Sequence, residues 1–243
     1  MSVGLKLAYI GTNYCGWQVQ TNGKSVQEAL QDAMEAAFGT RGTVTGCSRT
    51  DAGVHAKGFV CRADGIPESI PAHRIPLALG SRLPEDISVL EAWEAADTFH
   101  PRYDAKGKDY VYRIRNARVK DPFTASTTCL WQKPIDETAC NSLCKSLTGK
   151  HDFRSFMAAG SDITDTVREI YDFSCTREGD TVLFTVSANG FLYNMVRILV
   201  GTVLDLHDGV LKGTPETILA SLDRSAAGRT MPPGGLCLEK VFY

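Results

Sequence analysis

The residues best suited to chemistry lie in one short segment, residues 46–55, which reads Gly-Cys-Ser-Arg-Thr-Asp-Ala-Gly-Val-His. Its two glycines permit backbone angles that other residues avoid, and a cation, a hydroxyl and a carboxylate lie between them. A loop between two strands can present such a carboxylate rigidly. Asp51 is therefore the candidate catalytic residue, although an aspartate in this setting equally fits the cap of a turn.

Other chemistries fit the segment less well. A nucleophilic pair made from Cys47 and His55 would need a third group to orient the histidine, and the sequence does not supply one. A glycosidase needs a second carboxylate across the sugar, and the possible partners, Asp64 and Glu28, do not lie in a comparable loop. The glycine-rich patterns that hold nucleotide phosphates are absent from the sequence.

The elements around this segment follow from local patterns. The alternation of residues 5–10 predicts a strand, and Ser25 with Glu28 forms a capping box that opens a helix ending before Gly39. Two strands, 43–47 and 58–63, are predicted on either side of the loop 48–55. A helix over 71–83 and a strand over 87–93 complete the first half.

The second half repeats this order of elements. Its predicted elements are a strand over 109–115 with Tyr110, Tyr112 and Ile114 on one face, a helix begun by Asp136 and ended by Gly149, a hairpin of strands 168–176 and 181–187, an apolar helix over 191–206, a helix over 215–222 and a strand over 236–242.

Two successive βαββαβ patterns predict an α+β fold with two similar halves, residues 1–103 and 104–243. We expect the antiparallel sheets of the halves side by side, with helices packed on them and the active-site cleft between the halves. The polar stretch 98–108 is the expected hinge.

Composition and charge limit the classes of function. The net charge is −2, yet residues 102–120 carry seven basic side chains against two acidic ones, and phosphate binding depends on such a local potential. The 8 cysteines form no C-x-x-C pair, so we expect buried reduced thiols rather than a zinc site or disulfides. No apolar run is long enough to span a bilayer and no secretion signal opens the chain, so we expect a cytoplasmic protein.

Residues 49–55, Arg-Thr-Asp-Ala-Gly-Val-His, resemble the signature of the TruA family of tRNA pseudouridine synthases. Further motifs of that family follow in order along the chain: residues 9–20, 25–28, 83–87, 99–103, 108–112, 151–156, 195–197 and 232–236. Two departures, Gly80 in place of a commoner Asn and Pro101 in place of a commoner Ala, lie outside the catalytic loop.

The resemblance implies a pseudouridine synthase fold and an isomerase that converts uridine to pseudouridine without a cofactor or a metal. It implies Asp51 as the essential carboxylate, acting at C1′ of the sugar, at C6 of the uracil or as a base. It further implies Tyr110 as the ring that confines the released uracil and Arg197 as the cation beside Asp51. Arg49 would support the site, by holding a flanking phosphate or sugar.

The resemblance also implies the partners. The substrate would be the anticodon arm of tRNA, at positions 38, 39 and 40, with a homodimer as the active form and no DNA partner. Its target base must leave the stack to reach Asp51, and the basic run 102–120 would hold the RNA backbone. Three alternatives stay open: a pseudouridine synthase for another RNA, a non-catalytic RNA-binding relative, and a retaining glycosidase that would release free uracil.

Overall fold

A computed structural model describes residues 1–243 and divides them between two units, which are described one at a time. Unit 1 contains residues Met1–Lys106 together with Cys237–Tyr243, and unit 2 contains Gly107–Leu236. No helix has both the length and the apolar composition that crossing a membrane would require.

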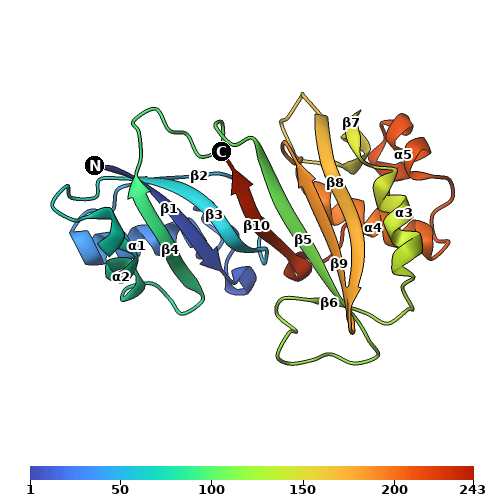
Figure 1. Cartoon of the computed structure of the whole chain (residues 1–243), viewed down its shortest axis with the longest axis horizontal. Coiled ribbons are helices and arrows are strands. Elements are labelled where there is room, and N and C mark those ends of the chain that lie inside the picture. The colour runs from blue at the N-terminus through green and yellow to red at the C-terminus, as the bar shows by residue number, and fades with distance from the viewer. The chain divides into compact units, whose positions relative to one another are not determined.

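Unit 1 is a sheet with helices that contains the elements predicted for the first half, in that order, and also the final strand, which was predicted for the second half (Figure 1). Its strands and helices are β1 (Ser2–Tyr9), α1 (Val26–Phe38), β2 (Thr43–Gly46), β3 (His55–Asp64), α2 (Ile75–Gly80), β4 (Ile87–Glu94) and β10 (Leu236–Phe242), with 3-10 turns at Gly11–Asn13 and Ala72–Arg74. The strands lie in the order β4-β1-β3-β10, and β2 pairs with β3. Strand β10 comes from the end of the chain and pairs in parallel with β3, with Cys237 opposite His55.

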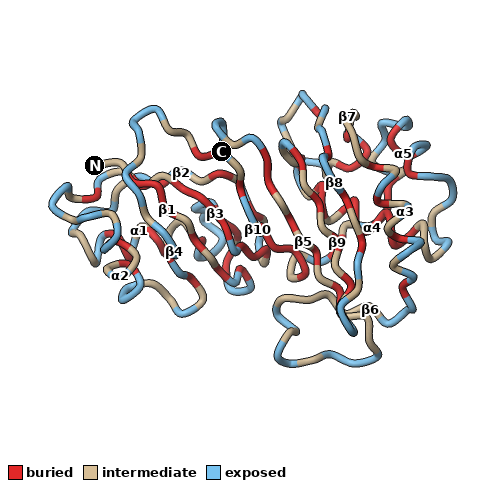
Figure 2. The backbone as a smooth tube through the Cα atoms, in the orientation of Figure 1, coloured by how far each residue is buried: buried red, intermediate tan, exposed pale blue.

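The core of unit 1 follows from the alternation in β1. Val3, Leu5 and Leu7 have no exposed surface and lie on one face of the strand, as the period-two pattern requires. The buried residues along β1 and β3 appear in red in Figure 2. On α1 the buried side chains are Val26, Ala29, Leu30, Ala33 and Met34, which lie along one face of the helix.

The predicted ends of α1 are confirmed. The Ser25 hydroxyl accepts a hydrogen bond from the Glu28 amide at 3.0 Å, and the Glu28 carboxylate accepts one from the Ser25 amide at 3.4 Å. Gly39 ends the helix in the left-handed conformation, with φ 74°.

The helix predicted over 71–83 is shorter in the structure. It consists of a 3-10 turn followed by α2, which ends at Gly80. Because Pro84 disfavours the helical conformation at Leu83, and no side chain caps the start of α2, the flanking residues form turns.

Unit 2 is a second sheet with helices (Figure 1). Its strands and helices are β5 (Gly107–Asn116), β6 (Cys129–Trp131), α3 (Glu137–Lys145), β7 (Gly149–Asp152), β8 (Val167–Glu178), β9 (Thr181–Ala188), α4 (Met195–His207) and α5 (Pro215–Ser221), with 3-10 turns at Arg154–Phe156, Arg224–Ala226 and Pro233–Gly235. The strands lie in the order β5-β9-β8-β7, paired antiparallel, and β6 pairs in parallel with β5. The expected α+β class, with mostly antiparallel sheets and helices, is thus confirmed in each unit.

Three features of unit 2 differ from the sequence expectation. Strands β6 and β7 were not predicted, because they are short and show no alternation. Gly149 begins β7 rather than ending α3, which ends at Lys145. Helix α4 begins at Met195 instead of residue 191, since Asn194 adopts the left-handed conformation with φ 59° and interrupts the helix there.

Candidate active site

In unit 1, the backbone on both sides of Asp51 is held by main-chain contacts. Asp51 forms a β-bridge with Gly16, and the carbonyl of Thr50 accepts a hydrogen bond from the Trp17 amide at 3.0 Å. The Thr50 hydroxyl is buried and hydrogen-bonded to the Tyr9 hydroxyl at 2.8 Å. These contacts fix the Asp51 Cα relative to the sheet while its side chain remains partly exposed.

Gly16 allows this close approach of two chain segments. It has φ +112°, and a Cβ at its position would lie 2.6 Å from the carbonyl oxygen of Thr50. Both the backbone conformation and the contact exclude larger residues. After Asp51 the chain turns back at once, since the Val54 amide donates to the Asp51 carbonyl at 3.1 Å and Gly53 has φ +78°.

His55 anchors the far end of the loop. Its ring is buried, and Nδ1 accepts a hydrogen bond from the Gly11 amide at 2.9 Å. A nitrogen that accepts from an amide cannot at the same time be the base for a thiol. Cys47 is fully buried, and burial, followed by the nearby Cys47, raises the pKa of Cys61 well above its ordinary value. These surroundings do not fit a Cys-His nucleophile pair, and Asp51 stays the candidate reactive group of the loop.

Tyr14 supports the same loop from the N-terminal side. Its carbonyl accepts the Gly53 amide at 3.4 Å, and its hydroxyl donates to the Asp86 carboxylate at 2.5 Å. Burial, and then the hydrogen bond to Asp86, raise the pKa of Tyr14. The phenol consequently stays protonated and keeps its role as a donor.

Two basic residues that are close to Asp51 in the sequence, Arg49 and Lys57, differ in their surroundings. Lys57 is exposed and its Nζ lies 3.5 Å from a carboxylate oxygen of Glu239. Arg49 is exposed and makes no hydrogen bond or ion pair. Of the two, Arg49 is thus the side chain available to a ligand.

In unit 2, Tyr110 lies on the buried face of β5, as its alternation predicted. It pairs with Val186 of β9, and its ring meets that of Phe191 edge-on, with centroids 5.1 Å apart at 83°. The neighbouring Tyr112 donates its hydroxyl hydrogen to the Pro232 carbonyl at 2.8 Å. Burial, followed by the nearby Cys129, raises the pKa of Tyr112, so its hydroxyl stays protonated.

Arg197 lies in the first turn of α4 and is oriented by two acceptors. Its Nε donates to the Met231 carbonyl and its Nη1 donates to Oδ1 of Asn194, both at 2.6 Å. The Met231 amide returns a hydrogen bond to the Arg197 carbonyl at 3.2 Å. The guanidinium is therefore held in one orientation rather than extending freely from the helix.

The structure therefore groups Asp51 and Arg49 in unit 1, and Tyr110 and Arg197 in unit 2. Sequence reasoning did not predict the two acceptors, Met231 and Asn194, that orient Arg197. Asn194 precedes it by three residues, a helical spacing that could have indicated the contact. Met231 is 34 residues away, and no local pattern predicts that pairing.

Some basic side chains of the run 102–120 form ion pairs, and others do not. Arg115 lies between two carboxylates, 3.8 Å from Asp121 and 3.6 Å from Asp180. Arg118 and Lys120, in the loop after β5, are exposed and form no ion pair. No group of three or more His, Cys, Asp or Glu side chains is arranged to hold a metal ion, and the 8 cysteines are free thiols.

Comparisons with known proteins identify a matching family and similar proteins. Residues 7–104 and 143–243 match a protein family described as tRNA pseudouridine synthase. The chain is 42% identical to tRNA pseudouridine synthase A of Clostridium acetobutylicum over 100% of this chain and 99% of that protein. It is 45% identical to the protein of the same name from Moorella thermoacetica, covering 98% of each. The corresponding protein of Halalkalibacterium halodurans is 43% identical over 96% of this chain and 89% of its own length.

Among solved structures, a Cbf5-Nop10-Gar1 complex contains a similar chain, with a TM-score of 0.41 and 12% identity over 98% of this chain and 58% of that chain. This likeness is remote and does not bear on the activity.

Proposed function

The chain belongs to the family of tRNA pseudouridine synthases, and on that basis we propose that it converts uridine to pseudouridine at positions 38, 39 and 40 of the tRNA anticodon arm. The observation that carries the proposal is identity of 42–45% to relatives named tRNA pseudouridine synthase A over nearly the whole chain, with the Asp51 loop included. The enzyme is an isomerase.

The reaction needs little beyond a positioned carboxylate. The bond between N1 of uracil and C1′ of ribose breaks, the uracil turns, and a bond from C5 to C1′ forms, while the hydrogen on C5 is lost and N1 gains one. Substrate and product have the same atoms, so no electron or group has to be supplied from outside. Holding the released base is consequently as important as breaking the bond.

We assign Asp51 as the catalytic carboxylate. It lies in a loop whose backbone is fixed at Gly16, Thr50 and Val54, which gives the side chain a defined origin. A cation beside an ionised carboxylate lowers its pKa, and Arg197, whose guanidinium is already oriented by Met231 and Asn194, is assigned that part. This assignment requires both units to present their residues to the same nucleotide.

Tyr110 is assigned to the uracil ring. An aromatic side chain provides a flat, apolar surface on which a base can stack, and the Tyr110 ring is kept in place by its edge contact with Phe191. Arg49 is assigned to a phosphate or sugar beside the target nucleotide, because its exposed guanidinium has no protein partner.

The tRNA backbone is assigned to the exposed cations of unit 2. Arg118 and Lys120 form no ion pair, so their charges are available to phosphates despite the net charge of −2. Family membership is also the support for a homodimeric, cytoplasmic enzyme. Light scattering after size-exclusion chromatography tests the first of these two properties, and cell fractionation tests the second.

The central experiment is a pseudouridine assay on an unmodified tRNA with uridines at 38, 39 and 40, read by carbodiimide mapping. Wild type should convert these positions, and Asp51→Asn should lose at least about a thousandfold in rate while it retains tRNA affinity. The matched control is Asp32→Asn, which changes an exposed carboxylate of unit 1 paired with Arg41 and should leave the rate unchanged. A folded wild type that binds tRNA but makes no pseudouridine would overturn the proposed activity, and free uracil would indicate a glycosidase.

A further inference from the structure

A segment of unit 2, residues 228–232, runs along helix α4 and is called the strap here. The contact is very close: a Cβ on Gly201 of the helix would lie 1.9 Å from the carbonyl oxygen of Arg229. On the strap side, a Cβ on Gly228 would lie 2.6 Å from the Cα of Thr202. Glycine at both positions allows backbone to touch backbone, so the strap has little freedom to shift against α4.

Polar contacts tie the strap to helix α4 at three residues. The Gly228 amide donates to the Thr202 hydroxyl at 2.9 Å. The Arg229 amide donates to the Asp205 carboxylate at 3.0 Å. Met231 then exchanges backbone and side-chain hydrogen bonds with Arg197, as described above. The carbonyl that orients Arg197 is therefore carried by a segment fastened further along the same helix.

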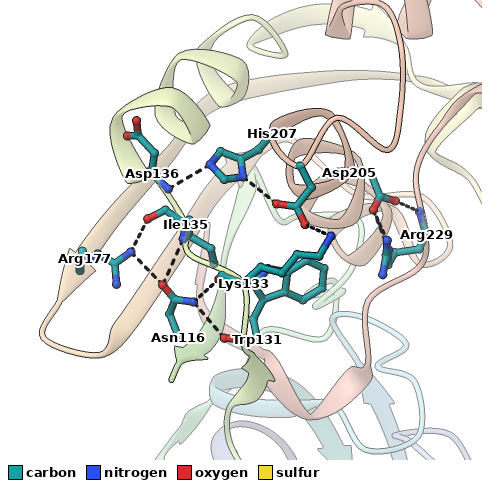
Figure 3. Close-up of polar contacts among 10 residues, drawn as sticks. Asn116, Trp131, Lys133, Ile135, Asp136, Arg177, Asp205, His207 and Arg229 are labelled. Carbon is teal, nitrogen blue, oxygen red and sulfur yellow. Dashed lines mark hydrogen bonds and ion pairs between the residues drawn. The ribbon is translucent and has the colours of Figure 1, made fainter. Parts of the chain in front are cut away.

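The strongest of these ties is the ion pair between Asp205 and Arg229 (Figure 3). Besides the amide contact, Nε of Arg229 donates to the Asp205 carboxylate at 2.8 Å and Nη2 lies 2.5 Å from it. The Asp205 side chain is only 5% exposed, so this carboxylate has little contact with water and depends on Arg229 as its partner. On its other side the guanidinium lies over the ring of Trp131, 5.3 Å from the centroid.

The strap also reaches the strand that bears Tyr110. The carbonyl of Pro232 accepts the hydroxyl hydrogen of Tyr112, and Trp131 belongs to β6, which pairs with β5. The strap thus contacts both the helix that carries Arg197 and the strand that carries Tyr110.

We propose that Asp205 and Arg229 are positioning residues: by locking the strap onto α4 they hold the Met231 carbonyl where it orients the Arg197 guanidinium. This inference rests on the proposed function, in which Arg197 is the cation that serves Asp51. Neither residue of the pair is assigned to the substrate. They contribute by fixing the position and orientation of the Arg197 guanidinium, and small displacements of catalytic groups have large effects on rate.

The test compares Asp205→Asn with Asp208→Asn in the full-length protein. Asp208 is a fair control because its side chain is 4% exposed, it follows the same helix, and its ion pairs are with Lys133 and His207, which lie outside the strap. We expect Asp205→Asn to lower kcat about ten- to a hundredfold, with the KM for tRNA changed less than about twofold. Asp208→Asn should change kcat less than about twofold.

The decisive measurement repeats Asp205→Asn in an Arg197→Lys background. If Asp205 acts through Arg197, its effect on kcat should shrink to less than about twofold there, because lysine cannot make the same pair of directed contacts. An undiminished loss in that background, or an equal loss in Asp208→Asn, would overturn the proposal. Arg229→Gln, at a side chain that is 48% exposed, gives a second route to the same answer if Asp205→Asn does not fold.

Failure of the inference can be told apart from failure of the proposed function. If wild type forms pseudouridine and Arg197→Lys lowers kcat, but Asp205→Asn does not, the strap has no positioning role and the function stands. If Arg197→Lys has the kcat of wild type, the role of Arg197 and this inference are both overturned while the enzyme activity remains. If wild type forms no pseudouridine on tRNA, the proposed function itself is wrong.

Discussion

The two regions assigned to catalysis are held in place in different ways. The Asp51 loop of unit 1 is fixed mainly by backbone contacts, which involve Gly16, Thr50 and Val54. Arg197 in unit 2 is fixed by side chains and by a carbonyl from a distant segment. The first arrangement requires that Gly16 has no side chain. The second requires the oxygen atoms of Met231 and Asn194 that accept hydrogen bonds from Arg197.

This difference indicates how each region should respond to change. A loop fixed by close backbone contact resists any added atom but is indifferent to charge around it. A guanidinium held by directed hydrogen bonds tolerates changes of volume but not the loss of an acceptor. Substitutions in the loop should therefore lower the free energy of unfolding, and substitutions around Arg197 should mainly lower kcat.

The largest expected effect is that of Gly16→Ala. The new methyl group would meet the Thr50 carbonyl at 2.6 Å in a backbone conformation with φ +112°, so the free energy of unfolding should fall by about 3 kcal/mol and pseudouridine formation should fall with it. Gly39→Ala is the control, because Gly39 has φ +74° with no atom within 4 Å of the added Cβ, and it should cost only about 1 kcal/mol. Urea denaturation measures both. Equal costs would show that conformation alone, and not the contact with Thr50, governs the loop.

A smaller effect, on turnover instead of stability, is expected at Asn194. Asn194→Gly keeps the left-handed backbone, with φ 59°, but removes the oxygen that accepts from Arg197, so kcat should fall about tenfold with the unfolding free energy nearly unchanged. Asn194→Ala adds the backbone penalty and should also lower the unfolding free energy by about 1 kcal/mol. Steady-state kinetics and urea denaturation on both variants separate the two terms. A glycine variant with wild-type kcat would argue against side-chain control of Arg197.

The helix caps allow a comparison of the units that does not involve either site. Ser25 caps α1 and is fully buried, whereas Thr214 caps α5 with the equivalent box and is exposed. Ser25→Ala should lower the unfolding free energy by about 1–2 kcal/mol and Thr214→Ala by about 0.5–1 kcal/mol, since an exposed helix end can turn to water. Thermal denaturation of the two variants gives the order, and the reverse order would contradict this use of burial.

The smallest effect is a dependence on pH in unit 2. Burial raises the pKa of Asp208, but hydrogen bonds from Lys133 and His207 outweigh it and hold the pKa below its ordinary value. A carboxyl whose pKa is lower in the folded state contributes stability above its unfolded pKa, and that stability is lost as the pH falls through the folded pKa. The melting temperature of wild type should thus drop more steeply below about pH 4 than that of Asp208→Asn. If the melting temperatures of the two proteins fall in parallel as the pH is lowered, Asp208 does not contribute to the acid sensitivity.

Much of the site was predictable because its signals are local. The loop with Asp51 lies between two recognisable strands, the capping box of Ser25 sets the start of α1, and alternation alone places Tyr110 on the buried face of β5. Each of these depends on residues within a few positions of one another, where propensity and sterics act directly.

What only the tertiary structure decided depends on contacts between distant residues. Strand β10 joins the sheet of unit 1 through pairing with β3, although it follows unit 2 in the chain. The strap is placed on α4 by Gly201 and Gly228, and the sequence around either glycine does not indicate its partner. Sequence by itself therefore determined most of the local elements, and it named the candidate residues that those elements carry. The orientation of Arg197 was decided by packing, because close backbone approach and a buried ion pair form only when remote segments meet.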